Sequence, residues 1–237
     1  MNRRTPWTRR DARAPVGADG SGHGGEGYFW DHVDLVGAYF SDTGVTVATG
    51  VSSWGDQSGN GRHLVQATGT KQPAWAASGG PNSTPSLEFD GGAGDDDALS
   101  YAAYTGNIGT VFAVISANVA TFSGYEGIVT EISDGETWIL LRDATTLVYT
   151  GGNPAPTTYM DGTLTNDFGD PRDWTIVEVT STPTATNGIL VGWDRSVAST
   201  TFDGAIAAIL IYSSTLSASA RTKIRTGLSS KYAITVA

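Results

Sequence analysis

The sequence predicts an all-β sandwich with one short helix near its C-terminus. Short runs rich in Val, Ile, Thr and aromatic residues recur along the 237 residues, and Gly, Asn, Asp and Pro separate them, as in strands joined by tight turns. Charged residues make up 16% of the chain, below the usual ~25%, and Thr, Gly, Ser and Ala are abundant instead, which favours many short strands joined by tight turns. A spacing of four between apolar residues, typical of a helix, occurs near the C-terminus.

The predicted strands follow one another at short intervals. Residues 110–115 are apolar on both faces, so we expect this strand to lie inside a sheet that is covered on both sides. Residues 127–132 and 138–142 flank Asp134-Gly135, a dipeptide typical of a hairpin turn. The other predicted strands cover residues 35–40, 86–89, 146–149, 174–179, 188–191 and 205–212.

One helix is predicted after the last strand. Ser217 is its candidate N-cap, since a serine side chain accepts a hydrogen bond from the first helical turn. Ala220, Ile224 and Leu228 follow at a spacing of four and form one apolar stripe. We expect this stripe to face the sandwich.

Composition excludes several kinds of chemistry. The chain has no Cys, which excludes disulfides, thiol catalysis and thiolate metal sites. Its three His residues have no metal-ligand spacing, and no apolar run reaches the ~18 residues of a membrane span. The sequence contains neither a G-x-S-x-G nucleophile motif nor a Walker A loop.

Residues 1–27 form a basic, Gly-rich extended arm that differs from the body, residues 28–237. Five arginines against Asp11 give the first 13 residues a charge of +4, which leaves −14 for the rest of a chain with net charge −10. An anchoring arm of this kind docks on an acidic partner, whereas a plain solubilising terminus docks on nothing. The residues assigned to the anchor are Arg3, Arg4, Trp7, Arg9, Arg10 and Arg13.

Charge also limits the partners of the body. At −14 it repels phosphate, so we do not expect it to bind nucleic acid. The arginines of the arm pair with carboxylates as readily as with phosphates, so the arm fits either nucleic acid or an acidic protein surface, including another copy of this chain. No apolar leader follows the first residues, which predicts synthesis and assembly in a cytoplasm.

Three segments carry a resemblance to a known family. They are Val51-Ser52-Ser53-Trp54-Gly55-Asp56-Gln57-Ser58-Gly59-Asn60-Gly61-Arg62-His63-Leu64, Pro85-Ser86-Leu87-Glu88-Phe89-Asp90-Gly91, and Phe202-Asp203-Gly204-Ala205-Ile206. In order and spacing the chain from about residue 35 to 232 resembles the laminin-G-like branch of the concanavalin A-like lectin/glucanase superfamily. This implies a concanavalin A-like jelly-roll β-sandwich. Because the fold hosts lectins, glycosidases, adhesion modules and virion proteins, it does not fix the function.

The motifs themselves are first of all structural. The run from Asp56 to Gly61 combines turn-forming side chains with two glycines able to adopt positive φ, and we expect Trp54 to pack beneath it. A glucanase of this fold needs Glu-x-Asp-x-x-Glu on one strand. The nearest pattern, from Glu131 to Glu136, has Ser133 at the middle position. We therefore predict a protein that is not an enzyme and has no catalytic residues.

Two kinds of binding site remain. Exposed aromatic rings stack on sugars, and acidic side chains bind sugar hydroxyls; Trp193, Trp75 and Asp194 are the candidates near predicted loops. The sequence requires no cofactor, but calcium binds oxygen ligands such as those of Asp95, Asp96 and Asp97. The alternative for these three residues is a solvated acidic turn.

The pattern as a whole predicts a structural virion protein of a bacteriophage, at the head or on the tail or fibre surface. The arm would anchor it to capsid or tail subunits, with other copies of the chain as neighbours, and the displayed domain would bind host glycans. The alternative is a bacterial cell-surface or secreted carbohydrate-binding module or adhesin that depends on calcium. Neither interpretation includes a membrane-spanning segment.

Overall fold

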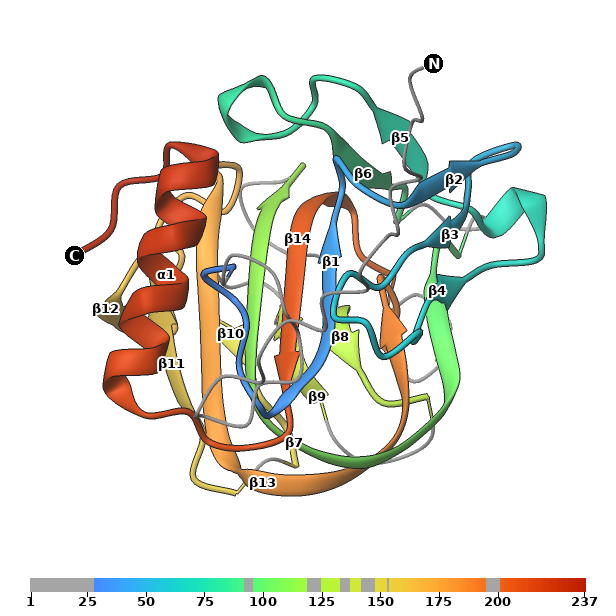
Figure 1. The fold of residues 1–237 in the computed structure, drawn as a ribbon. Helices are drawn as coiled ribbons and strands as arrows, with labels where there is room; N and C mark the ends of the chain where they lie inside the picture. Colours follow the sequence, from blue (N-terminus) through green and yellow to red (C-terminus); the bar gives the residue numbers. More distant parts are fainter. Residues whose placement is uncertain are drawn as a thin grey trace, which may run out of the picture.

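The computed structural model describes residues 28–91, 96–118, 125–132, 137–141, 148–152, 154–194 and 201–237. The arm and the Asp134-Gly135 turn lie outside these ranges, so the domain boundary at residue 28 stays a prediction. The described residues form fourteen strands and one α-helix (Figure 1). The elements are β1 (Leu35–Phe40), β2 (Val45–Val47), β3 (Val51–Trp54), β4 (Leu64–Val65), β5 (Ala74–Ala76), β6 (Ser86–Phe89), β7 (Leu99–Ala117), β8 (Glu126–Thr130), β9 (Thr137–Leu141), β10 (Val148–Tyr149), β11 (Thr157–Met160), β12 (Thr163–Leu164), β13 (Thr175–Val191), β14 (Gly204–Tyr212) and α1 (Ala218–Tyr232).

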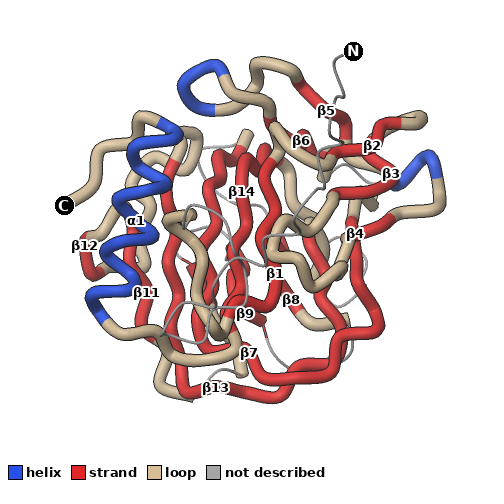
Figure 2. Tube along the Cα trace, viewed as in Figure 1, coloured by secondary structure: helices blue, strands red, loops and turns tan. Residues whose placement is uncertain are grey.

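Two long antiparallel strands, β7 and β13, run through both layers of the sandwich. They pair from Thr175 opposite Ile115 to Val191 opposite Leu99. β7 descends on the right of the molecule, turns at the bottom and rises on the left, and β13 follows the same path in the opposite direction (Figures 1 and 2). Register shifts interrupt the pairing at the bend, where Gly188 has φ +80°. Because the two strands bend together, one folded sheet supplies both layers.

Each half of the β7–β13 pair carries its own set of neighbours. The half of β7 nearer its C-terminus pairs with β14, which in turn pairs with β1 and β6, while β11 pairs with the first half of β13. The other half of β7 pairs with β4, and β8 pairs with the end of β13 and leads on to β9 and β10. The result is a jelly-roll-like β-sandwich, which confirms the predicted fold class.

Three strand predictions are wrong in extent. Residues 174–179 and 188–191 belong to one strand, β13, because the chain crosses the bend without leaving the sheet. The central strand β7 begins at Leu99 rather than at residue 110. The sequence pattern missed its first half because that half is polar and only partly buried. The predicted strands at residues 35–40 and 86–89 have the bounds of β1 and β6.

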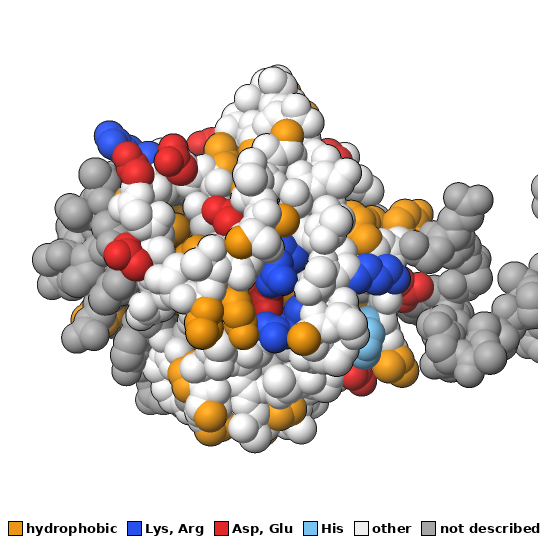
Figure 3. Space-filling view, turned by 90° about the vertical axis from the view of Figure 1, so that its left-hand side faces the viewer, with side chains coloured by type: hydrophobic (Ala, Val, Ile, Leu, Met, Phe, Trp, Pro, Cys, Tyr) orange, Lys and Arg blue, Asp and Glu red, His pale blue; other side chains and the backbone are white. Residues whose placement is uncertain are grey.

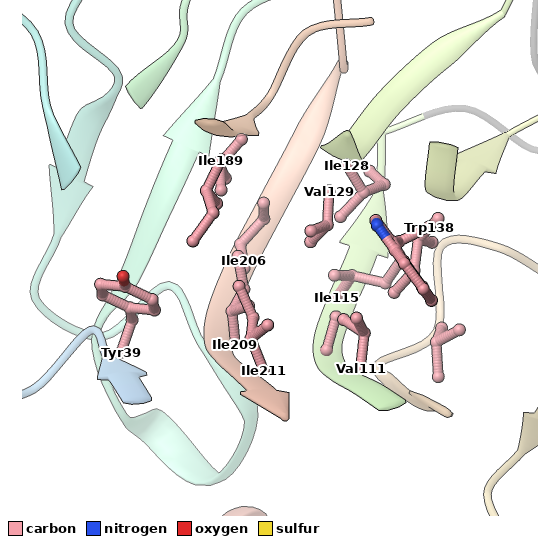
Figure 4. Packing of buried hydrophobic residues seen from close by; sticks show 14 of the residues in the cluster. Tyr39, Val111, Ile115, Ile128, Val129, Trp138, Ile189, Ile206, Ile209 and Ile211 are labelled. Atoms are coloured by element: carbon pink, nitrogen blue, oxygen red, sulfur yellow. The ribbon is translucent and has the colours of Figure 1, made fainter. Parts of the chain in front are cut away.

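The second half of β7 is buried on both faces, as predicted. Val111, Ala113 and Ile115 face the core between the layers, and Phe112 and Val114 face the helix. Figure 4 shows isoleucines of β14 pointing into the core that also holds Ile115 and Trp138. Alternating side chains thus divide one strand between two hydrophobic cores.

Helix α1 covers the outer face of the layer that contains β1, β14 and the adjoining halves of β7 and β13, called the first layer below (Figure 1). The Ser217 hydroxyl accepts a hydrogen bond from the Ala220 amide, so the predicted N-cap is confirmed. Ile224 and Leu228 are buried, and Ala220 packs against the same core. The predicted apolar stripe therefore attaches the helix to the sheet. No helix among the described residues is long and apolar enough to cross a membrane.

A buried ion pair also joins the helix to the sheet. Glu178 of β13 is 1% exposed, and its carboxylate accepts hydrogen bonds from Arg221 and from Arg225, the latter at 2.6 Å. On this side of the molecule, basic side chains gather around an acidic one in a shallow hollow (Figure 3). The Arg221 guanidinium also lies over the Tyr159 ring, 4.8 Å from its centroid. One carboxylate thus holds two helical turns against the strand.

The Asp56 turn protects the free edge of β1. The Asp56 carboxylate accepts hydrogen bonds from the amides of Ala38, Ser58 and Arg62 and from the Ser58 hydroxyl. The turn also donates to β1 carbonyls, since the Asn60 side chain binds those of Leu35 and Val36. An exposed edge strand is a site for unwanted pairing, so this turn has a structural role.

The residues around this turn support that role. Gly59 and Gly61 have φ +83° and +70°, and the fully buried Trp54 donates from its indole nitrogen to the Phe40 carbonyl, 2.9 Å. Burial, with the Asp56 carboxylate nearby, raises the pKa of the Tyr39 hydroxyl well above its ordinary value. The neutral hydroxyl donates to the Arg62 carbonyl at 2.6 Å.

Glu178→Gln should lower the free energy of unfolding by about 3 kcal/mol, because it leaves two mostly buried arginines without their counter-charge. Urea unfolding followed by tryptophan fluorescence measures the change. The control is Asp170→Asn, which breaks the exposed pair with Arg172 and should leave the unfolding midpoint unchanged. Equal midpoints for the two variants would contradict the role of Glu178.

Candidate functional site

A cleft of about 620 Å³ lies where β5, β6, β7 and β14 end or begin. Its lining mixes hydroxyl, amide and carboxylate side chains with an aromatic ring. The lining residues are Thr70, Gln72, Ala74, Glu88, Phe89, Asp90, Asp97, Asn118 and Asp203.

The bend of β7 brings both of its ends to this cleft. Asp97 lies two residues before the first residue of β7, and Asn118 directly follows its last residue, yet both line the cleft. A straight strand of this length would separate its ends by roughly 60 Å. The cleft therefore exists because the strand folds back on itself.

Strand register places the other carboxylates. Phe89, the last residue of β6, pairs with Gly204, the first residue of β14, so Asp90 and Asp203 leave the sheet side by side. A Cβ atom built on Gly91 would lie 2.8 Å from the Asp203 Cβ, which shows how closely these two segments pass. The cleft thus gathers acidic side chains from segments more than a hundred residues apart in the sequence.

Hydrogen bonds hold these side chains in place. The Asn118 side-chain amide donates to the Asp203 carboxylate at 2.6 Å, and the Asn118 backbone amide donates to the Asp203 carbonyl at 3.1 Å. The Asp97 carboxylate accepts from the Asp90 amide at 3.0 Å. The Ser86 hydroxyl donates to Glu88. The cleft therefore presents oriented acceptors, which suit a ligand that carries many hydroxyl groups.

Trp193 is not among the described lining residues, but it lies close to the cleft. It follows Gly192, where an added Cβ would lie 2.4 Å from the Phe89 ring and 2.9 Å from the Asp97 carbonyl oxygen. The Trp193 side chain is half-buried, and the Lys71 ammonium lies over its ring, 5.0 Å from the centroid. Lys71 is also 3.4 Å from the Asp96 carboxylate.

The other two predicted sugar-binding residues lie elsewhere. Asp194 is 1% exposed, so its carboxylate presents little surface to a ligand. Trp75 is 40% exposed, but its strand neighbour Ala74 lines the cleft, and alternation places Trp75 on the opposite face of the β5–β6 pair. Its indole nitrogen donates to the Ser41 carbonyl at 3.0 Å.

The predicted calcium ligands do not form a cluster in the described part of the chain. Asp95 lies outside it, Asp96 pairs with Lys71, and Asp97 accepts from the Asp90 amide. Among the described residues, no group of three or more His, Cys, Asp or Glu side chains is placed to hold a metal ion. Calcium binding through Asp95, Asp96 and Asp97 stays a prediction.

Sequence analysis missed most of the cleft. It used Phe89-Asp90-Gly91 and Phe202-Asp203-Gly204 as carriers of a family resemblance, and it did not predict that the end of β6 and the start of β14 lie side by side. Only strand pairing reveals that they are neighbours. The repeated Phe-Asp-Gly tripeptide at two strand ends was the signal available in the sequence.

A second hollow of about 610 Å³ lies between β10, β11 and β12. Four threonines and one asparagine supply polar groups, and none of its described lining residues is charged. Its lining residues are Val148, Thr150, Pro156, Thr157, Thr158, Leu164, Thr165 and Asn166. It lacks the aromatic ring and the carboxylates of the first cleft.

The chain has a distant structural likeness to a domain of known structure. No family model matches the chain, and no curated protein matches it. Among solved structures, domain 4 of AbnA, a GH43 extracellular arabinanase from Geobacillus stearothermophilus, in complex with arabinotriose, matches with a TM-score of 0.48 and 15% identity. The match covers 81% of this chain and 98% of that domain. A likeness this distant carries no conclusion about what this chain binds.

Gly192→Ala should destabilise the wall of the cleft. Gly192 has φ +86°, and a methyl group there would collide with Phe89 and the Asp97 carbonyl. We expect a loss of about 3 kcal/mol in the free energy of unfolding from crowding and backbone strain together. Gly61→Ala is the matched control, since Gly61 also has positive φ but nothing within 4 Å of its added Cβ. It should lose only about 1 kcal/mol, and equal losses would show that the close contact at Gly192 is unimportant.

Proposed function

We propose that this chain is a carbohydrate-binding β-sandwich and that the cleft between β6, β7 and β14 holds the saccharide. The observation that carries the proposal is the cleft lining, in which carboxylate, amide and hydroxyl side chains from five segments of the chain converge. Its volume of about 620 Å³ suits a small ligand, since ligand sites typically span ~300–1,000 Å³.

The lining suits sugar hydroxyls for a chemical reason. A hydroxyl group both donates and accepts, and carboxylates bind its donor strongly because they are charged acceptors. Asn118 and Gln72 add amides that both donate and accept. A partly apolar sugar face can lie against an aromatic ring, and Trp193 supplies one at the edge of the cleft.

Trp193 and the lysine above it would act together. The Lys71 ammonium covers one face of the indole, so a sugar either uses the uncovered surface or displaces the ammonium. Lys71 lies between Thr70 and Gln72, which both line the cleft, so a ligand in the cleft lies close to this side chain. Trp75 contributes nothing in this proposal.

A second candidate function, glycoside hydrolysis, is favoured by one observation. Four carboxylates line one cleft, and paired carboxylates are the groups that most glycosidases use. We propose binding without hydrolysis, in line with the absence of Glu-x-Asp-x-x-Glu from the sequence. Release of new reducing ends from any bound oligosaccharide would support hydrolysis instead.

Removing the cleft amide should weaken binding. We expect Asn118→Ala to lower the affinity for a glycan found on an array by about tenfold, because it removes a donor and frees Asp203. We expect Trp193→Ala to do the same without loss of fold, measured by isothermal titration calorimetry and thermal melting. Trp75→Ala is the matched control and should bind as the unaltered chain does. Retained binding in both cleft variants would exclude this cleft as the site.

We also propose a setting for the domain, in which it is displayed on a bacteriophage virion and residues 1–27 attach it. Support comes from the sequence, where a +4 segment precedes an acidic body. The alternative setting is a bacterial surface or secreted protein.

Deletion of residues 1–27 should then abolish co-sedimentation with virions while residues 28–237 keep their melting temperature and glycan affinity. The measurement is sedimentation of the two chain forms with purified particles. Equal co-sedimentation of both forms would contradict an anchoring arm.

A further inference from the structure

We infer that the cleft selects its saccharide by charge, admitting uncharged glycans and rejecting those that carry carboxylate or sulfate groups. This inference rests on the proposed function, since it names the class of glycan that the proposed site takes. It depends on which side chains line the cleft and on how they are held.

The lining carries an unbalanced set of formal charges. Glu88, Asp90, Asp97 and Asp203 are acidic, and none of the lining residues that the structure describes is basic. The net charge of −10 for the whole chain adds to the negative potential at the cleft. A concave site surrounded by protein concentrates such a potential, so an anionic ligand pays an electrostatic cost to enter.

Protein donors already orient three of these four carboxylates. Asp203 accepts from Asn118, Asp97 accepts from the Asp90 amide, and Glu88 accepts from Ser86, so each is already oriented by a protein donor. A carboxylate has about four acceptor sites, so Glu88 and Asp203 can also accept from a ligand hydroxyl. A ligand carboxylate or sulfate has no proton to donate at neutral pH and would face acceptors with acceptors.

The nearest lysine is held to one side. Lys71 lies between two lining residues, but its ammonium is 3.4 Å from the Asp96 carboxylate and over the Trp193 ring. These contacts direct its charge to the Asp96 side chain and the indole. To bind an acidic sugar, Lys71 would have to exchange both contacts for one with the ligand.

The test compares pairs of glycans that differ only in charge. An array carries neutral oligosaccharides beside their C6-oxidised uronate derivatives, and titration calorimetry then measures each pair that contains a binder. At about 20 mM salt we expect the neutral member to bind at least about tenfold more tightly. At about 500 mM salt the difference should shrink severalfold, because salt screens the repulsion.

Charge removal in the cleft should reduce this selectivity. In the double variant Glu88→Gln, Asp203→Asn we expect the ratio of neutral to uronate affinity to fall about tenfold, even though the loss of two charged acceptors weakens binding of the neutral glycan itself. Asp31→Asn is the matched control, since Asp31 lies beside Tyr212 and does not line the cleft. It should leave the selectivity unchanged. If the double variant does not fold, the salt dependence of the unaltered chain decides the question.

The results distinguish a failure of charge selection from a failure of saccharide binding in the cleft. A uronate that binds as tightly as its neutral partner, with binding lost in Asn118→Ala, would overturn charge selection and keep the cleft as a saccharide site. Binding of no glycan of either charge would overturn the proposed function, and the inference with it.

Discussion

The antiparallel pairing of β7 with β13 is the constraint on which the rest of the structure depends. The pair begins at Thr175 opposite Ile115 and ends at Val191 opposite Leu99, crossing a bend on the way. Every other strand in the described part of the chain joins this pair, directly or through a neighbour. Because the bend turns one sheet into two layers, it creates the inner core, and it also returns both ends of β7 to one place. The cleft is thus a geometric consequence of the fold.

The surfaces that the bent sheet leaves open are closed by polar interactions as well as apolar ones. The Asp56 carboxylate organises a turn over the edge of β1, and Glu178 fixes the helix over the outer face of the first layer. Both acids are buried, and their carboxylates accept hydrogen bonds from protein donors. Glu88, Asp90 and Asp203 of the cleft differ because they are more exposed and lie near strand ends beside open space. This division separates structural acids from those available to a ligand.

The sequence was sufficient for features that depend on local pattern. Short β-branched runs located β1 and β6, and a serine before an apolar stripe located the start of α1. The sequence did not predict the bend, because Gly188 and the polar residues around it are typical of a break between two strands although the chain stays in the sheet. The sequence did not predict the cleft for a related reason, because Asp90 and Asp203 become neighbours only through the register of β6 and β14. Pairing between distant strands has no local signature, so a site built from strand ends stays hidden until the topology is known.

The most direct test of the account is a map of where a saccharide binds. Backbone amide chemical shifts of the isotopically labelled chain would be recorded by NMR during titration with a neutral oligosaccharide that binds. We predict that the largest chemical-shift changes occur at both ends of β7, around Asp97 and Asn118, together with Asp90 and Asp203. Changes confined to the second hollow around Thr158 and Asn166, or to the surface around Trp75, would contradict it.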